Sequence, residues 1–538
     1  MTAMAGDRAG RSGLGPLLAA ILAVETRPAL LILLTAPVSV AGAWALWSAD
    51  VVLSRLAVID LLYNLSGAWH IAYGDDPHDG FRDALGQLNF WLTALGFQLT
   101  GPSVRAFLVG EIIMLAVLLA AACSAAVPRL PLVAAAVFVL FSALHAIVPV
   151  NVGDPLDDFT FGMSYNRYGW GALGILALIL FVPPRNPEAP RRLDIAIGTA
   201  LIAMMFYLKL TYFIVGIGGL VLALLVSAHV KVSPAGWTLS LAALLGNAAA
   251  PHSHDYLADF VLAATSGFGE TYASNHVRLV FNNAAECALY GIGVVVAIVL
   301  WRRGQAPFRL PAAAIFLFTG GVALLAQNTQ AHSIPLGACI AFLLYDALGR
   351  QVGASQLPQG IVAGLLLVPA MSVGAAAIGI AGYHVAAARP EPLAVVDRTN
   401  LRGLAVPSVE GVRDPSAWQA HYLRTLVEAA ELFAGSDGPP GRVQVFDRVN
   451  PMPFVLGAPP PRGRDLWWEP GMPPRPAEQL LGDADHALIP KTPSSRQIPS
   501  LARTHYADYL AEHFPFRQET EHWTLLSRRP LGEKQPRT

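Results

Sequence analysis

Long apolar segments dominate the first 387 residues of the chain and restrict what it can fold into. A helix needs about 20 apolar residues to cross a bilayer, and about eleven segments approach that length. Only 14% of the 538 residues are charged, against about 25% in soluble globular proteins. We therefore predict an all-α polytopic membrane protein with about eleven transmembrane helices. The segments lie near residues 28–48, 104–126, 130–150, 168–183, 193–209, 211–230, 235–250, 284–301, 310–327, 334–349 and 358–386.

Net charge and cysteine placement exclude several classes of function. The formal net charge of −1 gives no electrostatic support for binding nucleic acid. The three cysteines, Cys123, Cys287 and Cys339, lie inside apolar segments, which is typical of buried hydrophobic residues rather than disulfides or metal ligands. No phosphate-binding GxxxxGK[ST] motif occurs, so ATP-driven chemistry at the inner face is not expected.

Basic residues indicate how the chain is oriented in the membrane. If the N-terminus is cytoplasmic, the short inner loops hold most of the Arg and Lys residues, as the positive-inside rule requires. The long loops 49–103, 151–167 and 251–283 then face outward. An odd number of spans also places the C-terminus outside. The two segments that flank Lys209 can alternatively be read as one broken helix.

The composition changes after residue 387, where Pro, Arg, Asp and Trp become frequent. Residues 418–434 have helical spacing, and short apolar runs at 443–446, 487–489 and 523–526 are predicted strands. We predict two domains: a transmembrane domain over 1–387 and an extracytoplasmic, periplasmic α/β domain over 388–538. The expected location is the inner membrane of a bacterium.

The first outer loop holds an unusual cluster of acids near the membrane boundary. Such residues are costly there and mark a functional site by default. A single carboxylate at Asp60 suits a general base; the alternative is a helix cap. The later acids read as solvated loop residues or caps, or together as oxygen ligands for a divalent cation. They are Asp75, Asp76, Asp79 and Asp83.

Two other positions suggest a site for an anionic lipid headgroup. Tyr165, Asn166 and Arg167 stand together at the start of an apolar segment, and Arg binds phosphate through two hydrogen bonds. Lys209 lies between two apolar runs, where a polyprenyl phosphate would neutralise its charge. In both places the alternative is a long basic side chain that only reaches out to water.

Loop 251–283 and the segment around Gln327 carry weaker signals. The run His252-Ser-His254-Asp255 gives a weak indication of a metal site, and a short amphipathic helix on the membrane is the favoured interpretation. Gln327 and Asn328 lie at an outer helix end, where they are expected either to bind sugar hydroxyls or to form a polar hairpin.

These features together resemble the GT-C superfamily of integral-membrane glycosyltransferases. Members have one span, then a large outer loop with an early catalytic Asp, followed by a run like G-x-x-P-x-x-D-F. The runs MSYNRYGWGAL at 163–173 and KLTYF around Lys209, with the Gln327-Asn328 pair, also resemble parts of bacterial members. The chain departs from the pattern at Leu61, where many members have Glu. The D-F pair is displaced as well, because Gly80 separates Asp79 from Phe81, and Gln87 replaces the usual Pro. The loop positions that carry the resemblance are Asp60, Gly74, Pro77, His78, Asp79, Phe81, Gly86 and Leu88.

The resemblance implies an enzyme that moves a sugar from a polyprenyl-phosphate donor to a lipid, glycan or protein acceptor, as in bacterial mannosyl- and arabinosyltransferases. It implies Asp60 as the base, Asp79 as a second catalytic candidate, and inversion at the sugar carbon. Candidates for the donor phosphate are Lys209, Arg167 and Arg278. Candidates for substrate binding are Tyr63, His78, Tyr165, Asn166, Gln327 and Asn328.

Metal dependence differs between branches of the superfamily. Donors with one phosphate often need no metal, so we expect no obligatory cofactor. A divalent cation would fit the oligosaccharyl-transferring variant, with Asp60, Asp157 and Asp158 as ligands.

Three other functions compete with this one. A transporter or flippase of lipid-linked glycans usually has inverted repeats and polar residues at the bilayer midplane, whereas here the polar groups cluster at outer ends. A glycan polymerase or ligase carries its large loop late in the chain. A non-catalytic GT-C relative would bind through its C-terminal domain. The sequence leaves the sugar, the acceptor and the oligomeric state open.

Overall fold

The computed structural model describes residues 24–531 except 186–191, 269–277, 327–332, 350–355, 390–392, 408–414, 435–439, 470–471 and 495–496. Each of the predicted apolar segments coincides with a helix. These helices are α2 (Pro28–Trp47), α5 (Ala106–Ala126), α6 (Leu132–Leu144), α7 (Ser164–Phe181), α8 (Arg192–Leu208), α9 (Leu210–Val226), α10 (Pro234–Ala248), α13 (Ala284–Arg302), α14 (Arg309–Leu325), α15 (Pro335–Gly349) and α16 (Gln356–Ala387).

The chain is a membrane protein by the length and composition of its helices. In the described part, four helices are long and apolar enough to cross a bilayer: Pro28–Trp47, Ala106–Ala126, Ala284–Arg302 and Gly364–Ala387. The other apolar helices are shorter, so a total of about eleven crossings stays a prediction. Large apolar side chains such as Leu33, Ile292 and Met371 are exposed on the bundle, as contact with lipid requires.

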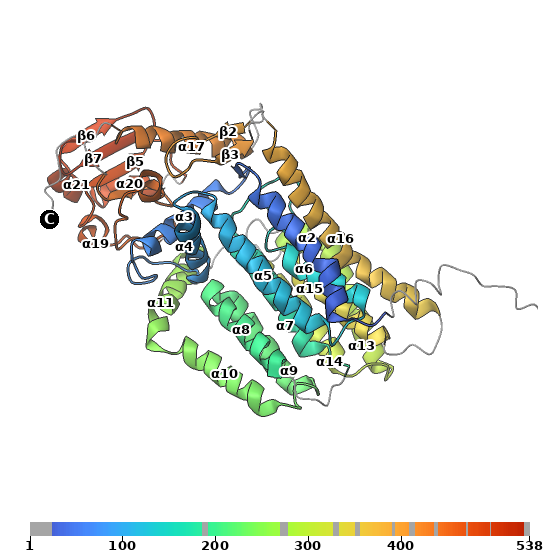
Figure 1. Ribbon diagram of the computed structural model, residues 1–538. Helices are drawn as coiled ribbons and strands as arrows, with labels where there is room; N and C mark the ends of the chain where they lie inside the picture. Colours follow the sequence, from blue (N-terminus) through green and yellow to red (C-terminus); the bar gives the residue numbers. More distant parts are fainter. Residues whose placement is uncertain are drawn as a thin grey trace, which may run out of the picture.

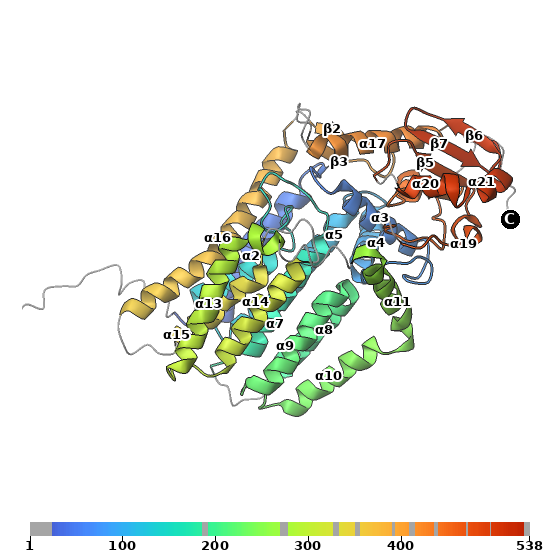
Figure 2. The same ribbon diagram turned by 180° about the vertical axis from the view of Figure 1, so that it is seen from behind.

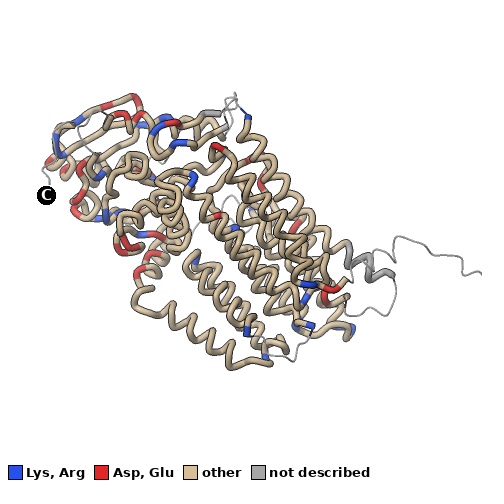
Figure 3. The backbone as a smooth tube through the Cα atoms, viewed as in Figure 1, with Lys and Arg blue, Asp and Glu red and all other residues tan. Residues whose placement is uncertain are grey.

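The helices pack lengthwise into one bundle (Figures 1 and 2). Helix α7 lies inside it and contacts α5, α6, α8, α9, α14 and α15, and its side chains are almost all buried. Figure 3 shows that the middle of the bundle has few charged residues and that acids and bases gather at the end next to the C-terminal part. Basic residues also lie at the opposite end of the bundle.

Helices α8 and α9 show whether the chain at Lys209 is one broken helix or two separate helices. Helix α8 ends at Leu208, Lys209 has an extended backbone, and α9 begins at Leu210. The two helices contact each other and lie side by side in both views. They therefore form a helical hairpin with Lys209 at its turn, rather than one broken helix.

The predicted first outer loop contains regular structure of its own. It holds strand β1 (Val52–Leu53) and the helices α3 (Val58–Ala72) and α4 (Leu88–Thr100). Nearly all side chains of α3 are buried, because the helix lies between α4 and the C-terminal part of the chain. At Gly67 a Cβ atom would come within 2.6 Å of Phe90 and 2.8 Å of Leu466, so only glycine permits this close packing.

The C-terminal part alternates strands with short helices. Strands β2 (Leu393–Val395) and β3 (Leu404–Pro407) join β1 in one sheet, in the order β1-β3-β2. A second sheet has the order β4-β5-β7-β6, in which β4 and β5 are parallel and the other pairs antiparallel. Its strands are β4 (Val443–Val445), β5 (His486–Pro490), β6 (Phe516–Glu519) and β7 (Trp523–Ser527). The helices are α17 (Pro415–Glu431), α18 (Met452–Leu456), α19 (Ala477–Leu481), α20 (Gln497–Thr504) and α21 (Ala507–His513).

The strands predicted at 443–446, 487–489 and 523–526 and the helix predicted at 418–434 coincide with β4, β5, β7 and α17. Buried side chains hold this part together. Trp523 is almost fully buried, and its indole N–H donates to the backbone oxygen of Thr425 at 2.6 Å.

The C-terminal part and the first outer loop interlock. Strand β1 pairs in parallel with β3 across about 350 residues of sequence. Arg82 forms an isolated bridge with Asp465, and the side chains of Trp69 and Ser66 donate to the backbone oxygens of Ala458 and Asn450. Residues on both sides of the predicted boundary at 387/388 therefore share one sheet and one packed interface.

Candidate active site

Asp60 lies in the first turn of α3 and is half-buried. Its N–H donates to the backbone oxygen of Ala57 at 3.1 Å, and the Val58 N–H at the start of this helix donates to Oε1 of Gln419 at 3.1 Å. Burial raises the pKa of Asp60 from 3.8 to about 7, against the opposing effect of the Arg448 charge. A carboxyl group whose pKa lies near the working pH suits a general base. The carboxyl group also accepts a backbone hydrogen bond in the first turn of α3, so the alternative prediction of a helix-capping role stands beside that of a base.

Tyr63 follows Asp60 by one helical turn, so their side chains lie on neighbouring positions of one face. The Tyr63 hydroxyl donates to Oδ2 of Asp83 at 2.5 Å. Asp83 is only 6% exposed, and burial raises its pKa to about 7. This carboxyl group therefore belongs to the cluster around Asp60.

The structure corrects the reading of two loop acids as solvated residues. Asp83 is buried as described, and Asp75 is equally buried between His70, whose Nδ1 lies at 2.9 Å, and the Nε of Arg462, at 2.7 Å. Asp76 is exposed, as expected. The reason is packing between distant segments, which local sequence does not reveal, because Arg462 of the C-terminal part contacts Asp75, and Tyr63 and Asp259 contact Asp83.

His78 is held in an oriented pair by Asp259 of α11 (His254–Ala263). Nδ1 of His78 lies 3.0 Å from Oδ2 of Asp259, and the Asp83 N–H donates to the same oxygen at 3.1 Å. The His78 backbone has a φ of 71°, an uncommon conformation for a residue other than glycine. Its Nε2 is buried and has no hydrogen-bond partner in the described chain. That atom is available to a substrate hydroxyl.

Lys209 lies at the turn of the α8–α9 hairpin, with its ammonium group among neutral partners. Nζ donates to Oδ1 of Asn166 at 3.3 Å, and the Tyr212 hydroxyl donates to the same oxygen at 3.3 Å. Nζ also lies 5.3 Å from the centre of the Tyr165 ring. Tyr165 is itself near Asp60 and Asp83, since both carboxylates act on its hydroxyl. Lys209 and the carboxylates of Asp60 and Asp83 are therefore linked through Tyr165.

Arg167 faces the interior of the bundle. Its Nη2 donates to Oε1 of the buried Glu111 at 3.2 Å, and Nη1 donates to Asn151 and to the Gly162 backbone oxygen at 3.4 Å. These contacts give Arg167 a structural partner, and its predicted role in binding phosphate stays a prediction.

The remaining predicted residues are scattered. Asp79 is exposed, and its N–H donates to the backbone oxygen of Asp76 at 3.3 Å. Arg278 is exposed in the helical residues 278–282. Gln327 and Asn328 lie outside the described residues.

The three predicted metal ligands do not share one site, because Asp157 and Asp158 pair with Arg55. Asp157 and Asp158 lie 2.5 and 3.3 Å from Nη1 of Arg55. In the described part of the chain, no three His, Cys, Asp or Glu side chains gather in a group that could hold a metal ion, and this includes Asp60 with these two acids. Metal independence remains a prediction.

The C-terminal part adds two residues that the sequence did not assign to the site. The Trp467 ring meets the Tyr63 ring edge to face, with centres 5.5 Å apart. The Arg448 guanidinium lies 5.4 Å from the Trp467 ring centre. Trp468, by contrast, is buried in the core beside Phe446. No local pattern marks Arg448, because only the fold brings it to α3.

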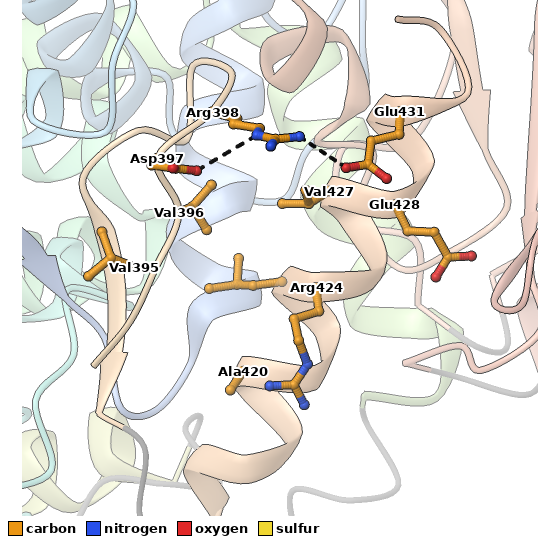
Figure 4. A pocket seen from close by; sticks show the side chains of 10 residues that line it. Val395, Val396, Asp397, Arg398, Ala420, Arg424, Val427, Glu428 and Glu431 are labelled. Atoms are coloured by element: carbon orange, nitrogen blue, oxygen red, sulfur yellow. Dashed lines mark hydrogen bonds and ion pairs between the residues drawn. The ribbon is translucent and has the colours of Figure 1, made fainter. Parts of the chain in front are cut away.

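A cavity of about 390 Å³ lies elsewhere, between β2 and α17 (Figure 4). Its walls include Val395, Val396 and Val427, and the guanidinium of Arg398 lies between the carboxylates of Asp397 and Glu431. None of the residues around Asp60 lines this cavity.

Comparison with known proteins finds similarity only among solved structures. No family model matches the chain, and no curated protein matches it. A crystal structure of ArnT from Cupriavidus metallidurans bound to undecaprenyl phosphate covers 93% of this chain and 99% of its own, at 14% identity and a TM-score of 0.39. Its apo state matches over the same shares at 13% identity and a TM-score of 0.37.

At these TM-scores the likeness carries no information on chemistry, so function has to rest on the residues around Asp60.

Proposed function

We propose that the protein is a membrane glycosyltransferase of the GT-C type. It moves a sugar from a polyprenyl-phosphate donor to an acceptor at the outer face of a bacterial inner membrane. The observation that carries this proposal is the environment of Asp60. A half-buried carboxyl group with a pKa of about 7 lies beside polar and aromatic residues, and the ammonium group of Lys209 lies against the ring of Tyr165, whose hydroxyl is affected by the Asp60 carboxylate.

Asp60 acts as the general base in this reaction. Its carboxylate takes the proton from the acceptor hydroxyl while the acceptor oxygen forms a bond to the anomeric carbon of the sugar. The bond between that carbon and the phosphate oxygen breaks on the opposite side, so the configuration inverts. The electron pair leaves with the polyprenyl phosphate.

Lys209 binds the donor phosphate and stabilises the charge that grows on it. Its ammonium group has neutral neighbours, Asn166 and Tyr165, and no carboxylate of the described chain forms an ion pair with it. An anion at this point would meet a positive charge that the protein has not neutralised. Electrostatic stabilisation of a leaving phosphate is the main catalytic task when no general acid is needed.

Other side chains contact the sugar or the acceptor. Nε2 of His78, which Asp259 orients, is the best-placed hydrogen-bonding atom, since it is buried and unpartnered in the described chain. Tyr63, Tyr165 and Asn166 complete this set. The reaction needs no obligatory metal, because Lys209 supplies the charge.

Sugar transfer by Asp60 variants tests the proposal. The wild-type protein in proteoliposomes should transfer sugar from a polyprenyl-phosphate donor, and Asp60→Asn should reduce kcat by about 100-fold or more. Asp76→Asn removes an exposed acid from the same loop and should leave transfer unchanged. Undiminished transfer by Asp60→Asn removes Asp60 from the mechanism. Failure of the wild-type protein with every polyprenyl-phosphate sugar rejects the assignment as a whole.

A further inference from the structure

The C-terminal part supplies a positive charge to the site through Arg448, which lies three residues after the end of β4. The Arg448 N–H donates to Oδ1 of Asp447 at 2.8 Å, and Asp447 is fully buried. The Arg448 backbone is thereby anchored to the interior of the C-terminal part. Its side chain extends toward the first outer loop, where it remains 29% exposed.

Neighbouring side chains hold the Arg448 guanidinium in place, but not all of its N–H groups have hydrogen-bond partners in the described chain. It lies 5.4 Å from the Trp467 ring centre, and its Nε lies 3.7 Å from Oε2 of Glu469. Trp467 donates its indole N–H to that same oxygen at 2.8 Å, which fixes the ring beneath the guanidinium. Nε is buried and has no hydrogen-bond partner in the described chain. Arg82 at the same interface differs, since it bonds Asp465 through two nitrogens at 2.6 and 3.0 Å.

Trp467 also connects Arg448 to α3. Its ring packs edge to face on Tyr63, 5.5 Å between centres, and Tyr63 lies one helical turn after Asp60. Arg448 is the charged residue that acts on Asp60, and it opposes the effect of burial. The phenols of Tyr63 and Tyr165 also face the Asp60 carboxylate, and both are uncharged at neutral pH.

Two further charged groups, Asp83 and Lys209, each contact one of these phenols. Asp83 lies behind the Tyr63 hydroxyl, and the ammonium group of Lys209 lies against the Tyr165 ring. Arg448 is therefore placed to balance the Asp60 charge from the side of the C-terminal part, as Lys209 is placed to balance the donor phosphate from the membrane side.

We infer that Arg448 is a positioning residue that keeps the Asp60 carboxylate ionised and ready to accept the acceptor proton, with Trp467 and Glu469 holding its guanidinium in place. This inference rests on the proposed function of Asp60 as a base. It also assigns the C-terminal part a role in the chemistry itself. Loss of the charge should affect kcat and its pH dependence, whereas affinity for the donor should change little.

The first test compares the pH dependence of transfer by the full-length protein with that of Arg448→Gln and Arg448→Lys. In Arg448→Gln the acidic limb of kcat should move to higher pH by about one unit, which is about a tenfold loss on that limb. KM for the donor should stay within about twofold, and Arg448→Lys should restore most of the wild-type profile.

Arg398→Gln is the matched control, since it removes an exposed arginine that pairs with Glu431 beside the cavity between β2 and α17. An unchanged pH profile in Arg448→Gln would overturn the inference. A raised donor KM at constant kcat would also overturn it, because Arg448 would then bind the phosphate.

The second test needs no transfer activity. Infrared difference spectroscopy can follow the carbonyl band of protonated Asp60, identified as the band that Asp60→Asn removes. In Arg448→Gln this band should persist to a pH about one unit higher than in the wild-type protein. If this shift occurs although wild-type transfer fails, the coupling of Arg448 to Asp60 holds and only the proposed enzyme activity is lost. If the band titrates identically in both proteins, the inference is wrong.

Discussion

Arg82 in the first outer loop and Asp465 in the C-terminal part form a two-pronged ion pair, with Nε to Oδ1 at 2.6 Å and Nη2 to Oδ2 at 3.0 Å. Asp465 is almost buried, and Nη2 of Arg475 lies 3.6 Å from its Oδ1. The backbones of Arg82 and Arg464 bond beside this pair. The pair therefore fixes the loop that carries the proposed base to the part of the chain that carries Arg448.

Removal of one partner of this pair should loosen the interface. We expect Asp465→Ala to destabilise the folded protein by on the order of 3 kcal/mol, because it leaves Arg82 and Arg475 without their shared carboxylate. Thermal unfolding in detergent measures the loss. Asp508→Ala, a change in α21 away from the loop, is the control. If both variants unfold alike, the ion pair does not hold the interface.

Lys209 should determine affinity for the donor. Lys209→Ala should raise KM for a polyprenyl-phosphate sugar at least about tenfold and weaken binding of sugar-free polyprenyl phosphate, because the ammonium group meets the phosphate directly. Titration of polyprenyl phosphate into protein in nanodiscs gives the affinity. Lys231→Ala is the control. Lys231 is exposed and lies beyond the end of α9 that is opposite to Lys209, and its Nζ donates to the backbone oxygen of Leu225. Unchanged binding by Lys209→Ala would remove the phosphate from this site.

Variants of Arg167 distinguish a structural role, pairing with Glu111, from the predicted role in binding phosphate. Its Nη2 bonds the fully buried Glu111, so Arg167→Gln should lower stability by about 3 to 5 kcal/mol through the unpaired carboxyl group. The double variant Arg167→Gln with Glu111→Gln should recover much of that loss. Binding of polyprenyl phosphate at a temperature where the variant is folded should stay normal. Weakened binding with normal stability would instead support the predicted phosphate contact.

Asp83 makes stability depend on pH. Its pKa is raised from 3.8 to about 7 by burial, so the folded protein resists its ionisation. The contribution to stability is present below about pH 4 and is lost as the pH rises through about 7. The total is at most about 4 kcal/mol, at about 1.4 kcal/mol for each pKa unit.

Asp83→Asn mimics the protonated acid and can still accept the Tyr63 hydrogen bond. Its unfolding temperature should therefore fall less than that of the wild-type protein between about pH 5 and about pH 8. Asp60 keeps its own pH dependence in the variant, because burial raises its pKa to about 7 as well. If the unfolding temperatures of the wild type and of Asp83→Asn change with pH in the same way, Asp83 ionises freely in the folded protein.

The sequence by itself determined the positions of the bundle helices and of three strands and α17 in the C-terminal part. Local physical chemistry is sufficient for these elements, since long apolar runs must form helices in lipid, and short apolar runs between turn residues favour strands. The same local reasoning drew attention to Asp60 and Lys209, because a charge at the edge of an apolar segment stands out in any membrane protein.

Only the tertiary structure decided which polar residues meet. Asp83 became buried and Asp79 exposed although both lie in one acidic run, because Asp83 contacts Tyr63 of α3 and Asp259 of α11 whereas Asp79 faces solvent. Arg167 was drawn to Glu111 inside the bundle, and Arg448 was brought to Asp60 across almost 390 residues. Contacts of this kind depend on packing between distant segments, and no local pattern of residues encodes them.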